Sequence, residues 1–330
     1  MKRHRKQLAN TLVLAFALIA AVATFLLPPS LQAQTQAQPS GIDPAVMAKA
    51  NAGDAKSQLL VGYAYYMGEG PQWDLAQAAT WYRKAAENGN STAQFSLGWA
   101  YLWGGYGITE DHNQAAAWFR KAAAGQLIEM SKVPQMIPGL TNPYSMLALI
   151  YEDGKDLPQD YSQAAFWYRK AAEQGEIDAQ SALGILYADG NGVPQDYEQA
   201  AAWFRKAANQ GSAANAVVAQ SNLGTLYLLG HGVPQDYKHA IEWFTKAANN
   251  GEPHAQYNLA ILYWRGQGVP ENDAAAYFLF DLAAARLSGS DRENAEKGRD
   301  ACATQLTPEV LSKAQEQASK WFAAHPPKSQ

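Results

Sequence analysis

The fragment Gly-Val-Pro-Gln-Asp-Tyr occurs twice in this 330-residue chain, at Gly192–Tyr197 and again at Gly232–Tyr237. Weaker copies of its surroundings recur along nearly the whole chain after residue 43. Five tryptophans, each following an alanine-rich stretch, mark the period: Trp81, Trp118, Trp167, Trp203 and Trp243. Their spacings of 37, 49, 36 and 40 residues define a unit of about 36 residues with two insertions. A fixed period of this length predicts a solenoid, in which each unit packs only against its neighbours.

Each unit has the pattern of two helices joined by a turn. In the fourth unit, Leu183, Gly184 and Tyr187 fall on one face of a helix. The turn 190–194 contains two glycines and a proline, which end that helix, and Asp196 can cap the next one. No segment alternates polar and apolar residues as a strand does. The sequence therefore predicts an all-α fold of antiparallel helix pairs.

The same positions recur in register six times. The small residue of the first helix is Gly62, Gly98, Ala148, Gly184, Gly224 and Ala260. Three residues later comes a tyrosine, namely Tyr65, Tyr101, Tyr151, Tyr187, Tyr227 and Tyr263. The small residues are expected where the two helices of a pair approach closely.

These motifs resemble the Sel1-like repeat, a relative of the tetratricopeptide repeat. The resemblance rests on Leu-Gly-x-Leu-Tyr, the Gly-x-Gly-Val-Pro-Gln-Asp-Tyr turn and Ala-x-x-Trp-Phe-x-Lys-Ala-Ala, and it covers roughly residues 47 to 287. It implies a right-handed superhelical solenoid of antiparallel helix pairs, with the first helices lining a concave face. It also implies an adaptor role in protein complexes and the exported, bacterial type of the family.

The chain divides into four segments. We expect a signal peptide at 1–33, a flexible leader at 34–42, a repeat array of about six units at 43–287, and C-terminal capping helices with a tail at 288–330. The array carries an insertion at 126–142 between its second and third units. A lone helix at Asp43–Ala52 is expected to cap the first unit, and helices at Asp291–Leu306 and Thr307–Phe322 to cap the last.

The first 33 residues have the pattern of an export signal. Basic residues at the start precede an apolar run at Thr11–Leu27, and Ala33 offers a cleavage point. This predicts a periplasmic or secreted protein, and the alternative is an uncleaved N-terminal anchor in the inner membrane. Removal of the segment takes away four basic residues and no acids, which changes the net charge from −4 to −8. A negative chain is a poor partner for nucleic acid or for an anionic membrane surface.

No group of residues has the pattern of a catalytic or metal site. The histidines are scattered without metal-ligand spacing, and the single cysteine, Cys302, is expected to be a buried small side chain. We therefore predict no enzyme activity, no cofactor and no metal. The acids at turns are expected to cap helices: Asp74, Asp111, Asp160, Asp196 and Asp236.

An Arg-Lys pair recurs near the end of four second helices, as at Arg169-Lys170 and Arg205-Lys206. Two interpretations are open. The pairs could form a basic ladder for an anionic polymer, or their stems could cover apolar surface while their charges complement the helix dipole. We favour the second.

The first helices also carry large side chains on the side opposite their packing face. A helical projection places Phe95, Trp99 and Trp103 there, at about 140° to 240° from Leu97. The candidate partner-binding residues are Tyr63, Tyr66, Phe95, Trp99, Trp103, Tyr257, Trp264 and Arg265. In the middle units smaller or acidic residues take these positions, among them Ser145, Asp153, Ser181 and Asp189.

We expect this face to bind a protein or peptide, as a scaffold or regulator in the cell envelope. The alternative partner is an envelope glycan such as peptidoglycan, because exposed rings also stack on sugars. A third interpretation is that the rings pack against neighbouring units.

Overall fold

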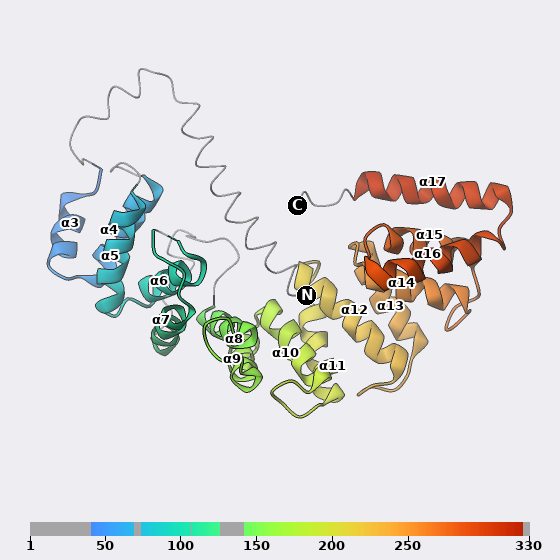
Figure 1. Cartoon of the computed structure of the whole chain (residues 1–330), viewed down its shortest axis with the longest axis horizontal. Helices are drawn as coiled ribbons and strands as arrows, with labels where there is room; N and C mark the ends of the chain where they lie inside the picture. The colour runs from blue at the N-terminus through green and yellow to red at the C-terminus, as the bar shows by residue number, and fades with distance from the viewer. Residues whose placement is uncertain (1–40, 69–73, 106, 126–141, 326–330) are drawn as a thin grey trace, which may run out of the picture. The chain divides into compact units, whose positions relative to one another are not determined.

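The computed structural model describes residues 41–68, 74–105, 107–125 and 142–325. These residues contain fifteen α-helices, α3 to α17, and no β-strand (Figure 1). They belong to two compact units, whose described parts are residues 41–125 and 142–325. The expected signal peptide, leader and insertion lie almost entirely outside the described residues, so those assignments stay predictions. None of the described helices is both long and apolar enough to cross a bilayer.

The helices follow one another as pairs. The first unit contains α3 (Pro44–Asn51), α4 (Ala55–Met67), α5 (Leu75–Glu87), α6 (Ser91–Trp103) and α7 (His112–Ala124). The second unit contains α8 (Pro143–Asp153), α9 (Tyr161–Glu173), α10 (Ile177–Asp189), α11 (Tyr197–Ala208), α12 (Ala214–Leu229), α13 (Tyr237–Asn249), α14 (Pro253–Trp264), α15 (Asp273–Ala284), α16 (Gly289–Ala303) and α17 (Pro308–Ala324). The even-numbered helices α4 to α14 are the first helices of six repeats, and α5 to α15 are the second helices. Consecutive helices pack together from α3 to α7 in the first unit and from α8 to α16 in the second, which confirms the predicted all-α solenoid.

The predicted aspartate caps are confirmed. Each side chain accepts a hydrogen bond from a backbone N–H two or three residues further on, at the starts of α5, α7, α9, α11 and α13. These bonds satisfy N–H groups that a helix end otherwise leaves without a partner. The recurring acid of the turn is therefore a structural residue of the repeat.

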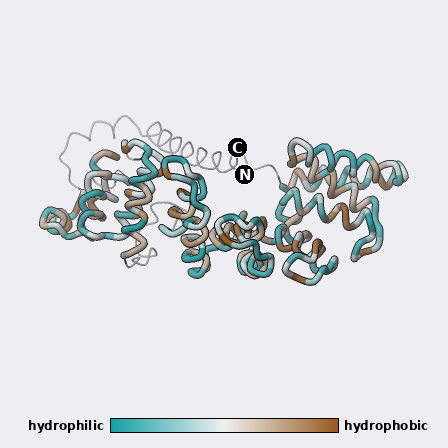
Figure 2. Tube along the Cα trace, turned by 60° about the horizontal axis from the view of Figure 1, so that its bottom comes forward, coloured by the Kyte–Doolittle hydropathy of each residue, from teal (hydrophilic) through white to brown (hydrophobic). Residues whose placement is uncertain are grey.

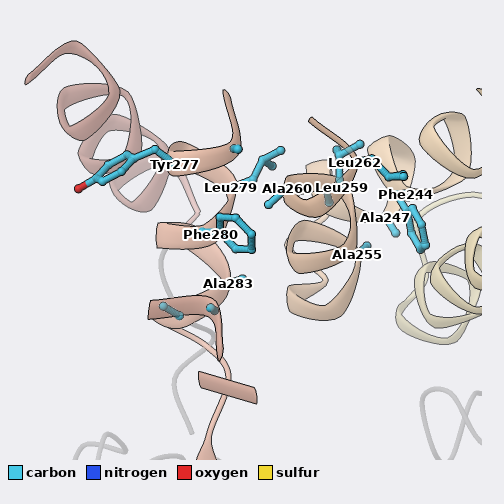
Figure 3. Close-up of a cluster of buried hydrophobic side chains, with 14 of the residues drawn as sticks. Phe244, Ala247, Ala255, Leu259, Ala260, Leu262, Tyr277, Leu279, Phe280 and Ala283 are labelled. Atoms are coloured by element: carbon cyan, nitrogen blue, oxygen red, sulfur yellow. The ribbon is translucent and has the colours of Figure 1, made fainter. Parts of the chain in front are cut away.

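The small residue of each first helix lies against an aromatic ring of the second helix, as expected. A Cβ atom built on Gly184 would lie 2.6 Å from Cε1 of Phe204, and one built on Gly224 would lie 2.8 Å from Cδ1 of Phe244. Both rings are fully buried. Figure 3 shows the cluster around Phe280 and Ala260, the corresponding pair in the last repeat. The helix pairs are thus held at a distance that admits a ring but little more.

The second glycine of the turn has a separate role. Gly192 has a φ of 72°, and a Cβ atom on it would lie 2.1 Å from the carbonyl carbon of Tyr161 in the preceding repeat. Gly232 meets Tyr197 in the same way. The motif repeats because this turn packs directly on the backbone of its neighbour, where no side chain fits.

A row of buried glutamines joins successive repeats. Their side-chain amides donate to carbonyl oxygens near the end of the preceding second helix, over 3.0 to 3.2 Å: Gln58 to Ala50 in α3, Gln94 to Ala86, Gln180 to Ala172, Gln220 to Ala208 and Gln256 to Ala248. Carbonyls at a helix end have no partner within the helix. Four of the five carbonyls also accept from the backbone N–H of a glycine three residues further on, so the glutamine is a second donor that connects each repeat to the one before it.

The contacts of the Arg-Lys pairs support the second interpretation, in which their long side chains cover apolar surface of the repeats. In three of the four pairs the lysine ammonium lies 3.8 to 4.1 Å from the ring centroid of a tryptophan in the same helix: Lys84–Trp81, Lys121–Trp118 and Lys206–Trp203. Lys170 of the fourth pair lies 5.8 Å from the Phe166 ring, and Lys246, which follows a threonine, makes the tryptophan contact with Trp243. The arginines reach the next repeat, where Arg83, Arg169 and Arg205 donate to the hydroxyls of Tyr101, Tyr187 and Tyr227. The pairs thus contribute cation–π contacts and bonds between repeats.

The described chain begins and ends on helices that cover the array. As expected, α3 starts after the cap Asp43 and packs on α4. Gly298 of α16 meets the Phe280 ring as a first-helix glycine would, while the rest of α16 is largely charged. The next helix, α17, begins after the predicted cap Thr307 and packs on α15. A polar outer surface is what a terminal cap of a repeat array requires.

Candidate functional site

Each first helix exposes the residue that lies five positions after its small residue, on the side opposite its packing face. Met67 is 48% exposed and Trp103 is 39% exposed, and the corresponding residues of the other repeats are exposed as well: Asp153, Asp189, Leu229 and Arg265. This position lies at about 240° in the helical projection. It is the position from which a side chain in every repeat can contact a partner.

Phe95 is not part of that surface. It is only 3% exposed and its ring centroid lies 5.4 Å from that of Phe119. The corresponding Ser145 and Ser181 are buried as well, so the predicted polar middle does not include them. The physical reason appears at Ser145, whose hydroxyl donates over 2.6 Å to Glu176 at the start of the next first helix. This corrects the sequence analysis, which counted these positions as groove residues.

The other aromatic candidates of the first unit are half-buried. Tyr63 and Tyr66 lie on α4 and pack against the core of the first two repeats. Burial raises the pKa of Tyr66, and the neighbouring Tyr63 adds to the effect. Trp99 is also half-buried, and a Cβ atom on Gly105 would lie 3.2 Å from its ring. The role of these three rings in binding stays a prediction.

The remaining candidates belong to the second unit. Tyr257 is half-buried and Trp264 is 36% exposed, with their ring centroids 5.7 and 6.4 Å from that of Phe280. Arg265 follows directly and is exposed. The structure therefore places the eight candidates in two groups, one in each compact unit. That both groups belong to one concave binding face stays a prediction.

The sequence analysis missed Leu60, which is 41% exposed on α4. With Tyr63 and Met67 it follows an i, i+3, i+7 spacing, so the three lie on one stripe of the helix. That spacing was the signal that could have found it. Figure 2 shows how apolar and polar stretches alternate along the helices. We call Leu60, Tyr63, Met67, Trp99 and Trp103 the first-helix face.

Two glutamates at corresponding positions have opposite electrostatic behaviour. Burial raises the pKa of Glu176 to about 7, although the Ser145 bond lowers it, and the nearby Asp178 raises it further. Burial also acts on Glu252, but bonds from His254, Ala255 and Ser221 bring its pKa below the usual value. Glu252 caps α14 through the backbone N–H of Ala255, whereas the Glu176 side chain makes no such bond to α10.

Reactive groups are few in the described part of the chain. Cys302 is buried, and burial together with the nearby Asp273 raises the pKa of its thiol to about 11. A thiol with so high a pKa is a weak nucleophile at neutral pH. Within the described ranges, no three His, Cys, Asp or Glu side chains are grouped so that they could hold a metal ion.

Consecutive helices form pairs, and in each pair a small residue of the first helix lies against an aromatic ring of the second. This arrangement defines an α-solenoid of short repeats. The chain belongs to the Sel1 repeat family, whose model matches residues 55–90, 91–126, 144–176, 177–212, 217–252 and 253–286. Proteins of this family generally serve as scaffolds for protein interactions. The comparison with curated proteins found no match.

Solved structures agree with this assignment. The chain is similar to c5321, a protective antigen of uropathogenic Escherichia coli strains with an SLR fold, at 30% identity and a TM-score of 0.60. That match covers 84% of this chain but 62% of the antigen, so the chain spans less than two thirds of its relative. A Sel1 repeat protein from Oxalobacter formigenes is 30% identical with a TM-score of 0.52, over 72% of this chain and 86% of the other.

Proposed function

We propose that this protein is a non-enzymatic scaffold or adaptor of the cell envelope, which binds a protein or peptide through its first-helix face. The observation that carries the proposal is the exposure of Leu60, Met67 and Trp103 on α4 and α6. Large apolar side chains exposed at equivalent positions of successive repeats are typical of interaction sites. A family of interaction scaffolds is consistent with the same role.

The chemistry of the face favours an apolar partner segment. Leu60, Tyr63, Met67, Trp99 and Trp103 are all uncharged, and burial of their surfaces would supply the main binding free energy. Methionine adapts to different shapes, and tryptophan is frequent among residues that dominate binding. The corresponding positions Asp153 and Asp189 in the second unit are acidic, so a basic residue in the partner would be favoured there.

The proposed location in the envelope rests on the N-terminal sequence. Basic residues, the apolar run Thr11–Leu27 and Ala33 have the order of an export signal. Cell fractionation with the intact chain and with residues 1–33 deleted tests this part. Export of the deleted form would contradict it.

The binding proposal predicts that Trp103→Ala combined with Met67→Ala weakens capture of the partner by about thirtyfold or more, as expected for loss of a central contact. The thermal midpoint should fall less than after a core substitution, because Met67 is 48% and Trp103 39% exposed. Capture from envelope extract, followed by titration with the identified partner, gives the measurement. Purified peptidoglycan serves as the second bait for the glycan alternative.

The matched control is Phe166→Ala, because Phe166 is 51% exposed but lies on α9, a second helix. The control should bind normally. Equal weakening by the control would show that the first-helix face has no special role. A large loss of thermal stability in the Trp103 variant would instead place that ring in the core.

A further inference from the structure

A hollow of about 500 Å³ opens between successive repeats of the second unit. It lies beside the turn that joins α10 to α11, two helices labelled in Figure 1. Its walls come from α9, α10, the turn and α11: Arg169, Tyr187, Pro194, Gln195, Asp196, Gln199 and Trp203. Small-molecule sites have volumes of about 300 to 1,000 Å³. None of these residues belongs to the first-helix face, so the inference does not rest on the proposed function.

The polar groups of the hollow are held in place by the fold. Arg169 donates to the Tyr187 hydroxyl, a bond that uses one of the five N–H donors of the guanidinium. The Asp196 carboxylate accepts from the backbone N–H of Gln199 over 3.0 Å. The Gln195 amide donates to the Ala188 carbonyl oxygen over 2.8 Å, which fixes the orientation of its own carbonyl group. Donors and acceptors are therefore present together and in fixed positions.

The hollow contains one positive side chain, Arg169, and one negative side chain, Asp196, so it favours neither an anionic nor a cationic ligand. A carboxylate placed near Arg169 would also meet Asp196, and an ammonium placed near Asp196 would meet Arg169. The two side chains carry opposite unit charges, so an uncharged ligand meets no net repulsion. Pro194 is exposed and adds apolar surface. Trp203 belongs to the buried core and is 9% exposed, so only a small part of its ring reaches the hollow, and the Lys206 ammonium lies 3.8 Å from its centroid.

We propose that this hollow binds a short uncharged oligosaccharide. A sugar hydroxyl both donates and accepts hydrogen bonds, which matches the mixed set of arginine, carboxylate and amide groups. The C–H surface of a sugar ring matches the exposed proline and the small part of the indole that reaches the hollow.

The next repeat differs at one of the positions that line the hollow. Arg205 again donates to a tyrosine, Tyr227, over 3.0 Å. However, His239 stands where Gln199 stands one repeat earlier, and its ring stacks on Tyr227 with centroids 5.1 Å apart. Its Nδ1 atom also lies 2.6 Å from Asp236. The imidazole of His239 thus covers the ring of Tyr227. The corresponding ring one repeat earlier, Tyr187, lines the hollow.

The test is calorimetric titration of the mature chain with two neutral probes, cellotetraose and chitotetraose, and with tetraglutamate as an acidic peptide. We expect at least one sugar to bind and to shift the NMR signal of the Trp203 indole N–H. Arg169→Gln and Gln199→His should each weaken binding by about tenfold or more, since each removes a hydrogen-bonding group or fills the space.

The matched control is Arg205→Gln, the same change one repeat further on, which should leave binding unchanged. Gln199 is exposed, so Gln199→His decides the matter even if Arg169→Gln disturbs folding. The proposal is overturned if neither sugar binds at millimolar concentration, if tetraglutamate binds more tightly than both, or if the control loses as much affinity as Arg169→Gln.

Discussion

Replacing Gly184 with leucine is expected to destabilise the second unit by about 3 kcal/mol, at the upper end of the usual cost of overpacking. Even a single added Cβ atom would lie 2.6 Å from the Phe204 ring, which is itself fully buried and has little space to move into. A change of this size lowers the thermal midpoint of a unit of this length by roughly 6 to 12 °C. Thermal unfolding followed by circular dichroism measures it.

The chain supplies the controls for this prediction. Alanine occupies the same position at Ala148 and Ala260, so Gly184→Ala should cost clearly less than Gly184→Leu. Combining Gly184→Leu with Phe204→Leu reduces the volume of the facing side chain and should recover part of the loss. An unchanged midpoint in Gly184→Leu, or no recovery in the double variant, would mean that the glycine and the ring are not in close contact.

Contacts within one repeat could be predicted from the sequence because the period repeats them six times. Gly184 was expected at a close approach of two helices, and the structure identifies Phe204 as the ring that it meets. Asp196 was expected as a helix cap and is one. Both inferences need only the helical period and the chemistry of turns, which are local properties.

The exposed surface was harder to predict, because a helical projection describes one helix and not its neighbours. The projection grouped Phe95 with Trp103, yet Phe95 is buried and Trp103 is exposed. In a solenoid each first helix also contacts the next repeat, and this contact leaves a narrower exposed stripe than the projection allows. Leu60 is exposed as well, and the repeat pattern does not reveal it, because the corresponding Ser96, Met146 and Ala182 are buried.

Bonds between repeats were missed for a related reason. The tyrosine three residues after the small residue was recognised as a repeated position, but its partner lies 18 or 22 residues before it in sequence. Nothing in the period alone says that Arg169 meets Tyr187. The same holds for Ser145 and Glu176, which are 31 residues apart and form the basis of the second large effect.

Glu176→Gln is expected to stabilise the second unit at pH 8 and to leave its stability nearly unchanged at pH 4.5. The folded-state pKa of Glu176 is raised from 4.5 to about 7, so the folded chain holds this proton more tightly than the unfolded chain does. Its contribution to stability is fully present below pH 4.5 and is lost as the pH rises through about 7. The full shift corresponds to about 3 kcal/mol, and we expect about 2 kcal/mol because the side chain is partly exposed and the N-terminus of α10 favours its ionised form.

Glu252→Gln is expected to have the opposite sign, which makes it the matched control for Glu176→Gln. The folded-state pKa of Glu252 is lowered, so its contribution is present above its unfolded pKa and is lost as the pH falls through the folded value. At pH 8 the Gln variant loses the charge-assisted bonds to Ala255 and His254 and should be less stable, by about 1 kcal/mol. Chemical unfolding of both variants at pH 8 and pH 4.5 measures the differences. If the two substitutions change stability in the same direction at pH 8, the opposite electrostatic roles of these two glutamates are wrong.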